Sequence, residues 1–195
     1  MASLAIRFAA RAETEPREVA RALVRGDADV IGRLVMQYHY RLLRYLVYLT
    51  GQRERAEDLV QETWIRVLER AGRYDGRSRF EPWLFSIARN LAIDELRRRQ
   101  RTGTETEEEA AGVAAPDGDS PFAAAAKSED AARVAGAMQA LEPIYREALL
   151  LRFQEEMSLE EIAQIAAAPV STVSSRIHRG LAMLRAELEG AGDAK

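Results

Sequence analysis

The helical pattern of this 195-residue chain collapses in one stretch, and this break most constrains the fold. From Thr102 to Ser120 the sequence is filled with acidic residues, Gly, Pro and Ala, without regularly spaced apolar positions. Such a segment cannot bury enough apolar surface to order itself. The break predicts two small domains joined by a flexible linker. The expected division is an N-terminal extension (1–26), a first domain (27–101), an acidic linker (102–120), a second domain (121–190) and a tail (191–195).

The first domain is expected to hold three helices. The first follows Asp27, a good N-cap residue, and ends near Gly51, where a left-handed residue can close a helix. The second carries an apolar stripe at helical spacing and ends at Gly72. The third runs from about Pro82, which suits a first helical turn, to Arg101.

The second domain is also predicted to be helical. One helix extends to Leu141, and another runs from Ile144 to Phe153. No alternating apolar pattern typical of a strand occurs anywhere in the chain. The predicted fold class is therefore all-α, with two small helical domains.

The last two helices have the dimensions of a helix-turn-helix. Ser158 and Glu161 form a capping box that opens a short helix to about Ala167, and Pro169 begins a longer one to about Leu188. Its expected buried stripe is Val173, Ile177, Leu181 and Leu184. The opposite face offers groups that can bind base edges or phosphates: Ser171, Ser174, Ser175, Arg176, His178 and Arg179. The pattern favours DNA binding, although an ordinary helical hairpin can imitate it.

The third helix of the first domain carries a second candidate for contact with nucleic acid. Its polar residues there are Arg89, Asn90, Asp94, Arg97 and Arg98. Asn suits adenine edges, and the arginines suit phosphates. The alternative is a solvated helix end whose arginines face the C-terminal end of the helix dipole.

Composition excludes several classes of function. Cysteine is absent and there are only two histidines, so a thiolate or imidazole metal site is not expected, and no cofactor is predicted. No apolar run is long enough to span a membrane. Arg7 and Arg11 break the apolar N-terminus, which therefore does not resemble a secretory signal. A cytoplasmic setting is expected.

Three ordered motifs resemble the extracytoplasmic-function (ECF) sigma factors of the sigma-70 class. Residues Ala56–Trp64 are similar to region 2.2, and Ser86–Asp94 with the following arginines is similar to region 2.4. Glu147–Phe153, Ser158–Ile165 and Pro169–Arg179 together resemble region 4. The resemblance implies a factor without catalytic activity that gives RNA polymerase core its promoter recognition.

The resemblance also implies roles for residues. Asp58, Gln61 and Glu62 would contact the clamp of the polymerase β' subunit, the β subunit being a further partner. The −10 element would be read by Arg89, Asn90, Asp94, Arg97 and Arg98, and the −35 element by Ser171, Ser174, Ser175, Arg176, His178 and Arg179. Tyr74, Phe80 and Trp83 flank the −10 site, as stacking platforms or as core residues. The family also implies a cognate anti-sigma factor.

The turn of the helix-turn-helix departs from the family pattern. Ala167 and Ser171 stand where the family commonly has Gly, and Ser174 stands where it has Lys or Arg. Ala at a position that requires a positive φ costs stability. These changes leave the −35 contacts less firmly supported than the first domain.

Linker length and net charge both indicate that polymerase holds the domains apart. A 19-residue linker reaches about 60–65 Å when extended at about 3.3 Å per residue. Its relaxed span is only about 24 Å, whereas promoter elements roughly 17 base pairs apart are separated by about 58 Å. The net charge of −3 also disfavours tight binding to DNA alone. A stand-alone helix-turn-helix regulator remains the alternative function; a DNA-processing enzyme is disfavoured because no catalytic constellation is evident.

Overall fold

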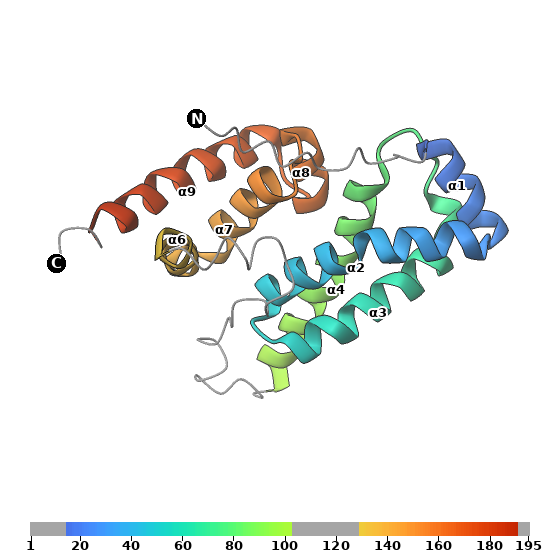
Figure 1. The fold of residues 1–195 in the computed structure, drawn as a ribbon, viewed down its shortest axis with the longest axis horizontal. Helices are drawn as coiled ribbons and strands as arrows, with labels where there is room; N and C mark the ends of the chain where they lie inside the picture. Colours follow the sequence, from blue (N-terminus) through green and yellow to red (C-terminus); the bar gives the residue numbers. More distant parts are fainter. Residues whose placement is uncertain (1–14, 103–128, 191–195) are drawn as a thin grey trace.

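The computed structural model describes residues 15–102 and 129–190, and all the regular structure in these two segments is helical (Figure 1). The predicted all-α class is confirmed. Of the predicted linker, only Thr102 is described, as the last residue of a helix; the rest lies outside the described residues, as does the predicted tail. We refer to residues 15–102 as the N-terminal body and to residues 129–190 as the C-terminal body.

The N-terminal body is built on the three predicted helices, preceded by one more. Its elements are α1 (Pro16–Arg25), α2 (Ala28–Thr50), α3 (Arg53–Glu69), a 3-10 turn (Ala71–Arg73) and α4 (Phe80–Thr102). The Asp27 side chain accepts a hydrogen bond from the Val30 backbone N–H at 3.2 Å, which confirms the predicted N-cap of α2. Gly51, in the left-handed conformation with φ 71°, ends that helix as expected. Helix α4 packs against both α2 and α3 (Figure 1).

Helix α1 lies in the segment that the sequence marked only as an extension. Val19, Ala22 and Leu23 are buried, so this helix contributes to the core of the N-terminal body. The loop before α4 passes very close to it at Gly76, which has a φ of 66°. A Cβ atom there would lie 2.7 Å from the Arg17 Cα, so only glycine permits this approach.

An aromatic cluster fixes the start of α4. The ring of Phe80 lies at its centre, with ring centroids 5.4 Å from Tyr74, 5.7 Å from Tyr38 and 5.8 Å from Trp83. Phe80 and Tyr74 are buried and Trp83 is half-buried. In this structure Phe80 and Tyr74 are therefore core residues, and they are not accessible as stacking platforms for bases.

The C-terminal body is a second small helical unit. Its elements are α6 (Glu129–Ala140), α7 (Pro143–Leu149), a π-helical turn (Leu150–Gln154), α8 (Leu159–Ala166) and α9 (Val170–Gly190). The predicted capping box is confirmed in both directions. The Ser158 Oγ accepts from the Glu161 backbone N–H at 3.2 Å, and the Glu161 carboxylate accepts from the Ser158 backbone N–H at 2.8 Å.

The buried stripe of α9 differs from the predicted one at a single position. Val173 and Ile177 are buried and Leu184 is partly buried, but Leu181 is 40% exposed, so its predicted burial is wrong. Gly180 takes the inward place because α7 crosses α9 closely there. A Cβ atom at Gly180 would lie 3.2 Å from the Leu149 Cγ.

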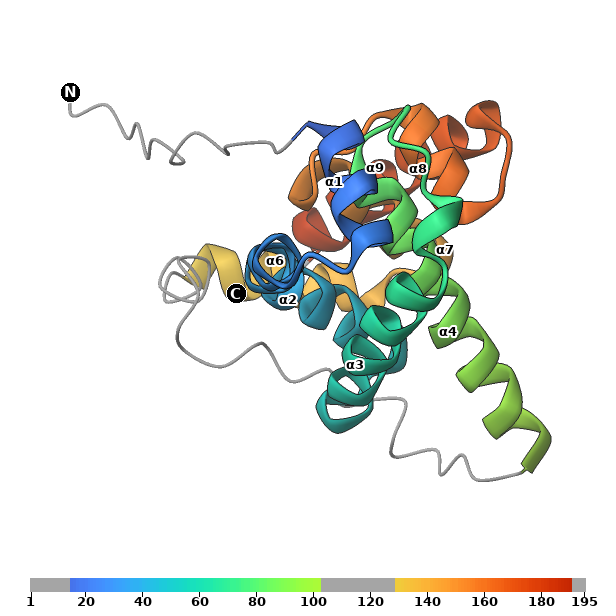
Figure 2. The same ribbon diagram turned by 90° about the vertical axis from the view of Figure 1, so that its right-hand side faces the viewer.

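The two bodies pack against each other. Helix α8 lies against α4, and α7 lies against α2 (Figure 2). The sequence predicted separate domains but offered no sign of this contact. No helix in residues 15–102 or 129–190 is both long and apolar enough to cross a membrane.

Ala167→Gly is expected to stabilise the protein by about 0.5–1 kcal/mol. Ala167 adopts φ 48° and ψ 46°, a left-handed conformation that costs an L-residue about 1–2 kcal/mol and costs glycine almost nothing. Part of that gain is offset because glycine has more freedom in the unfolded chain. Chemical denaturation would measure it. Ala166→Gly, one residue earlier and still helical, should instead destabilise; the reverse order of the two would contradict the assigned turn.

Candidate nucleic-acid interface

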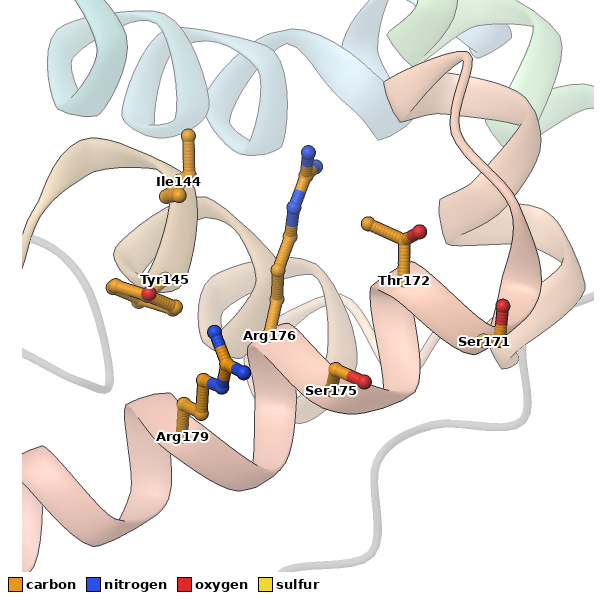
Figure 3. A pocket seen from close by; sticks show the side chains of 7 residues that line it. All are labelled: Ile144, Tyr145, Ser171, Thr172, Ser175, Arg176 and Arg179. Atoms are coloured by element: carbon orange, nitrogen blue, oxygen red, sulfur yellow. The ribbon is translucent and has the colours of Figure 1, made fainter.

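The helix-turn-helix presents most of its predicted contact residues on one side of α9. Ser171, Ser175, His178 and Arg179 are exposed, while Ser174 and Arg176 are half-buried. Arg176 and Arg179 border an open hollow of about 290 Å³ between the starts of α7 and α9 (Figure 3). Ile144 and Tyr145 of α7, together with Thr172, complete its lining. The sequence did not single out these three residues, because two come from another helix.

His178 and Ser174 are coupled within one helical turn. The His178 Nδ1 lies 2.8 Å from the Ser174 carbonyl oxygen and 3.4 Å from its Oγ. A carbonyl can only accept, so in the neutral ring Nδ1 carries the proton and Nε2 is an acceptor. His178 can therefore accept from an exocyclic amino group of a base, a role that a Lys or Arg could not take.

The five residues predicted on α4 divide into two groups. Asn90, Asp94, Arg97 and Arg98 are exposed along its C-terminal half. Their pairs are weak and superficial: the Arg97 Nη1 lies 4.0 Å from an Asp94 oxygen, and Arg98 binds Glu95. These side chains can exchange their partners for a phosphate or a base.

Arg89 is placed apart from that group. It turns toward the C-terminal body, where its Nε donates to Glu147 Oε1 of α7 at 2.8 Å. Burial by itself would lower the pKa of Arg89, but the hydrogen bond and charge of Glu147 outweigh it and raise the pKa. In this conformation Arg89 is committed to a protein contact.

The residues predicted to contact a protein partner share the outer face of α3. Asp58 and Gln61 are exposed, and Glu62 is half-buried and binds Arg66 at 2.8 Å. Ile65 and Leu68, 51% and 47% exposed, extend this face along the helix. We call Asp58, Gln61, Glu62, Ile65 and Leu68 the α3 face. The sequence analysis missed the two apolar members, although the spacing from Gln61 to Ile65 to Leu68 was a readable signal. Exposed apolar residues beside carboxylates suit a protein partner better than DNA.

No metal or cofactor site emerges from the part of the chain that the structure describes. Within it, no group of three or more histidine and carboxylate side chains could hold a metal ion. The arrangement instead offers two exposed polar helix faces and one acidic-apolar face, which are suited to macromolecular contacts.

Two family models match the chain. Sigma-70 region 2 covers residues 34–102, and Sigma-70, region 4 covers residues 131–184. The first spans α2 to α4, with the α3 face and the candidate positions on α4. The second spans α6 to α9, with the helix-turn-helix.

Curated relatives match over almost their whole length. The ECF RNA polymerase sigma factor SigW of Bacillus subtilis is 32% identical over 172 residues, which are 84% of this chain and 91% of that protein. The RNA polymerase sigma-H factor of Pseudomonas aeruginosa is 32% identical over 174 residues, 86% and 90% of the two chains. Among solved structures, the sigma factor RpoE of Bartonella quintana, in complex with the anti-sigma factor NepR, has a TM-score of 0.66 at 24% identity and covers 81% of this chain and 96% of its own.

Proposed function

The chain belongs to the ECF sigma factors of the sigma-70 family, and from that premise we propose which of its surfaces carry out promoter-specific initiation. As a sigma factor it binds RNA polymerase core and directs it to promoters. We assign no catalytic step to it and place its action in the cytoplasm, with the polymerase. The proposed division is a core-binding and −10-binding domain within residues 27–101 and a −35-binding domain within 121–190, with α1 as an added support of the first.

The α3 face is proposed as the main contact with polymerase, at the clamp of β'. The observation that supports this most directly is the exposure of carboxylates and apolar side chains together on a helix that is otherwise fixed in a core. Val60, Thr63, Trp64 and Val67 anchor the inner side of α3, so the outer side is presented rigidly. A rigid, partly apolar patch with charged groups has the composition of a protein interface.

Promoter DNA is assigned to two surfaces. Asn90 and Asp94 are proposed to lie near unpaired bases of the −10 element, with Arg97 and Arg98 on phosphates and Arg89 joining them when it leaves Glu147. The outer side of α9 is proposed for the −35 major groove: Ser171, Ser174, Ser175, Arg176, His178 and Arg179. Ser174 supplies no charge, so the −35 contact rests on Arg176 and Arg179 for attraction to phosphate.

A cognate anti-sigma factor is the further proposed partner. The support is the fold similarity to RpoE, which was solved with the anti-sigma factor NepR. An inhibitor of this chain is expected to cover the α3 face, because masking it prevents polymerase from binding. Competition between core and the purified inhibitor for this chain would test that expectation.

Purified core polymerase, the full chain and a promoter library provide the test of function. Transcription that requires the chain and starts at a defined set of promoters supports the proposal. Tight, specific binding to duplex DNA without core, with no stimulation of transcription, would overturn it in favour of a stand-alone helix-turn-helix regulator.

Asn90→Ala and Arg176→Ala are expected to impair different promoter elements. Loss of one good contact to a base or phosphate costs about 1–3 kcal/mol, so each variant should lower initiation about tenfold. Abortive transcription should show Asn90→Ala losing discrimination among −10 variants and Arg176→Ala losing it among −35 variants. Each serves as the control for the other. Equal effects of both variants on both elements would contradict the division, and Arg185→Ala, further along α9, should change neither.

A further inference from the structure

Two buried carboxylates of the C-terminal body are neutralised by arginines of the N-terminal body. Glu155, at the end of the π-helical turn, is 2% exposed. It accepts from the Nε of Arg41 at 2.7 Å and is also bound by Arg44. Both arginines belong to α2, more than 100 residues away in the sequence. No charged neighbour within its own body is seen to satisfy Glu155 in the described residues.

Glu147 repeats this arrangement on α7. It is 7% exposed, and its Oε1 accepts from the Tyr45 hydroxyl at 2.7 Å and from the Arg89 Nε at 2.8 Å. Burial, reinforced by Glu147, raises the pKa of Tyr45, so the hydroxyl keeps its proton and remains a donor. Tyr45 and Arg89 come from α2 and α4, so this carboxylate joins both helices to the C-terminal body.

A third contact closes the rim of the same interface. Arg79 lies 3.3 Å from Glu161 of α8 and 3.0 Å from Glu81 of its own body. In all three places the arginine comes from the N-terminal body and the interbody carboxylate from the C-terminal body. The charge is thus segregated between the two surfaces, each of which is poorly matched to burial without the other.

We propose that Glu147 and Glu155 latch the C-terminal body onto the N-terminal body in the free chain, and that this closed form must open for the promoter to be bound. Removing one side of a buried ion pair leaves an uncompensated charge, so a half-separated interface is unfavourable and the two states are discrete. On opening, arginines 41, 44 and 89 become available to a polyanion. DNA phosphates therefore compete directly with the two carboxylates.

The latch also orders the steps of initiation, a consequence that rests on the proposed function. The α3 face is exposed in the closed form, so polymerase can dock without opening it. Arg89, assigned to the −10 element, is occupied by Glu147, and the two DNA-binding surfaces are held on one compact molecule. Core binding is thus compatible with closure, whereas contact with both promoter elements is not.

Intramolecular fluorescence energy transfer on the full chain tests the latch. The chain has no cysteine, so Met36→Cys and Met183→Cys, at exposed positions of α2 and α9, provide two unique labelling sites. The free chain with native Glu147 and Glu155 should give one short, narrow distance distribution. Glu147→Gln with Glu155→Gln should increase the equilibrium constant for opening by about 100-fold or more, producing a long, broad distribution.

Matched variants keep the result decisive. Glu160→Gln removes an exposed carboxylate of the same body and should leave the distribution short. Arg41→Gln with Arg44→Gln attacks the latch from the other body and should also open it; circular dichroism identifies variants that retain their helices. If the double Glu variant loses helix, the double Arg variant decides. A broad distribution in the latch-intact free chain, or a short one in a folded double variant, overturns the latch. Transcription with core is measured separately, so sigma activity can persist when the latch fails.

Discussion

Asp58→Lys combined with Glu62→Lys is expected to abolish binding to RNA polymerase core while the helices remain folded. Each change replaces a negative by a positive charge on the α3 face. Juxtaposed like charges in an interface cost several kcal/mol, so core affinity should fall by more than about 100-fold. The fold should tolerate the change because both positions lie at the surface, and the lost Glu62–Arg66 pair is a superficial one worth about 0–1 kcal/mol.

Titration of labelled protein with core polymerase would measure this loss, with circular dichroism to establish folding. Glu160→Lys with Glu187→Lys makes the same change in net charge on α8 and α9 and should leave core affinity within about twofold. If the α3 variant bound core as well as the unsubstituted chain does, the assigned face would be wrong. If the control lost affinity equally, the effect would arise from net charge and not from the α3 face.

Local rules explain why the helices could be predicted. The Asp27 cap, the left-handed Gly51 and the reciprocal capping box of Ser158 and Glu161 each depend on residues within one helical turn. The positive φ at Ala167 was also foreseeable, since a turn of that length needs a left-handed residue. Elements whose signals are local are recoverable from a single sequence.

Features that depend on distant partners were not recoverable. Helix α1 is short, and its burial depends on the loop at Gly76 passing over it. Leu181 has the spacing of a buried residue, yet α7 passes nearer to Gly180. Glu147 and Glu155 look like solvated carboxylates in the sequence, and only the packing of the two bodies reveals their burial.

The candidate site was predicted unevenly for the same reason. Asn90, Asp94 and the exposed α9 residues lie on helix faces that periodicity can assign. Arg89 shares its helix with Asn90, but its partner is on α7, so its orientation follows from tertiary structure. The aromatic side chains near the −10 site showed the same limit, since composition could not separate a stacking platform from a core.

Phe80→Ala is expected to lower the free energy of unfolding of the N-terminal body by about 3–5 kcal/mol. This is the usual cost of truncating a buried aromatic residue. Phe80 is 3% exposed and lies among four rings, those of Tyr38, Tyr74, Trp64 and Trp83. The cavity has little chance of collapsing because those rings are held by three different helices and the loop before α4. Urea denaturation followed by tryptophan fluorescence would report the loss, since Trp64 and Trp83 both border the cavity.

The exposed Phe153 provides the matched control. It is 59% exposed on the π-helical turn, so Phe153→Ala should change stability by less than about 0.5 kcal/mol. Phe80 is also the first residue of α4, which carries the proposed −10 contacts; its truncation should therefore impair initiation at temperatures where the helices of the C-terminal body persist. A Phe80→Ala protein within about 1 kcal/mol of the unsubstituted chain would contradict the cluster's role, because surface substitutions already reach about half that size. Positioning of α4 would then depend on its contacts with α2, α3 and α8 alone.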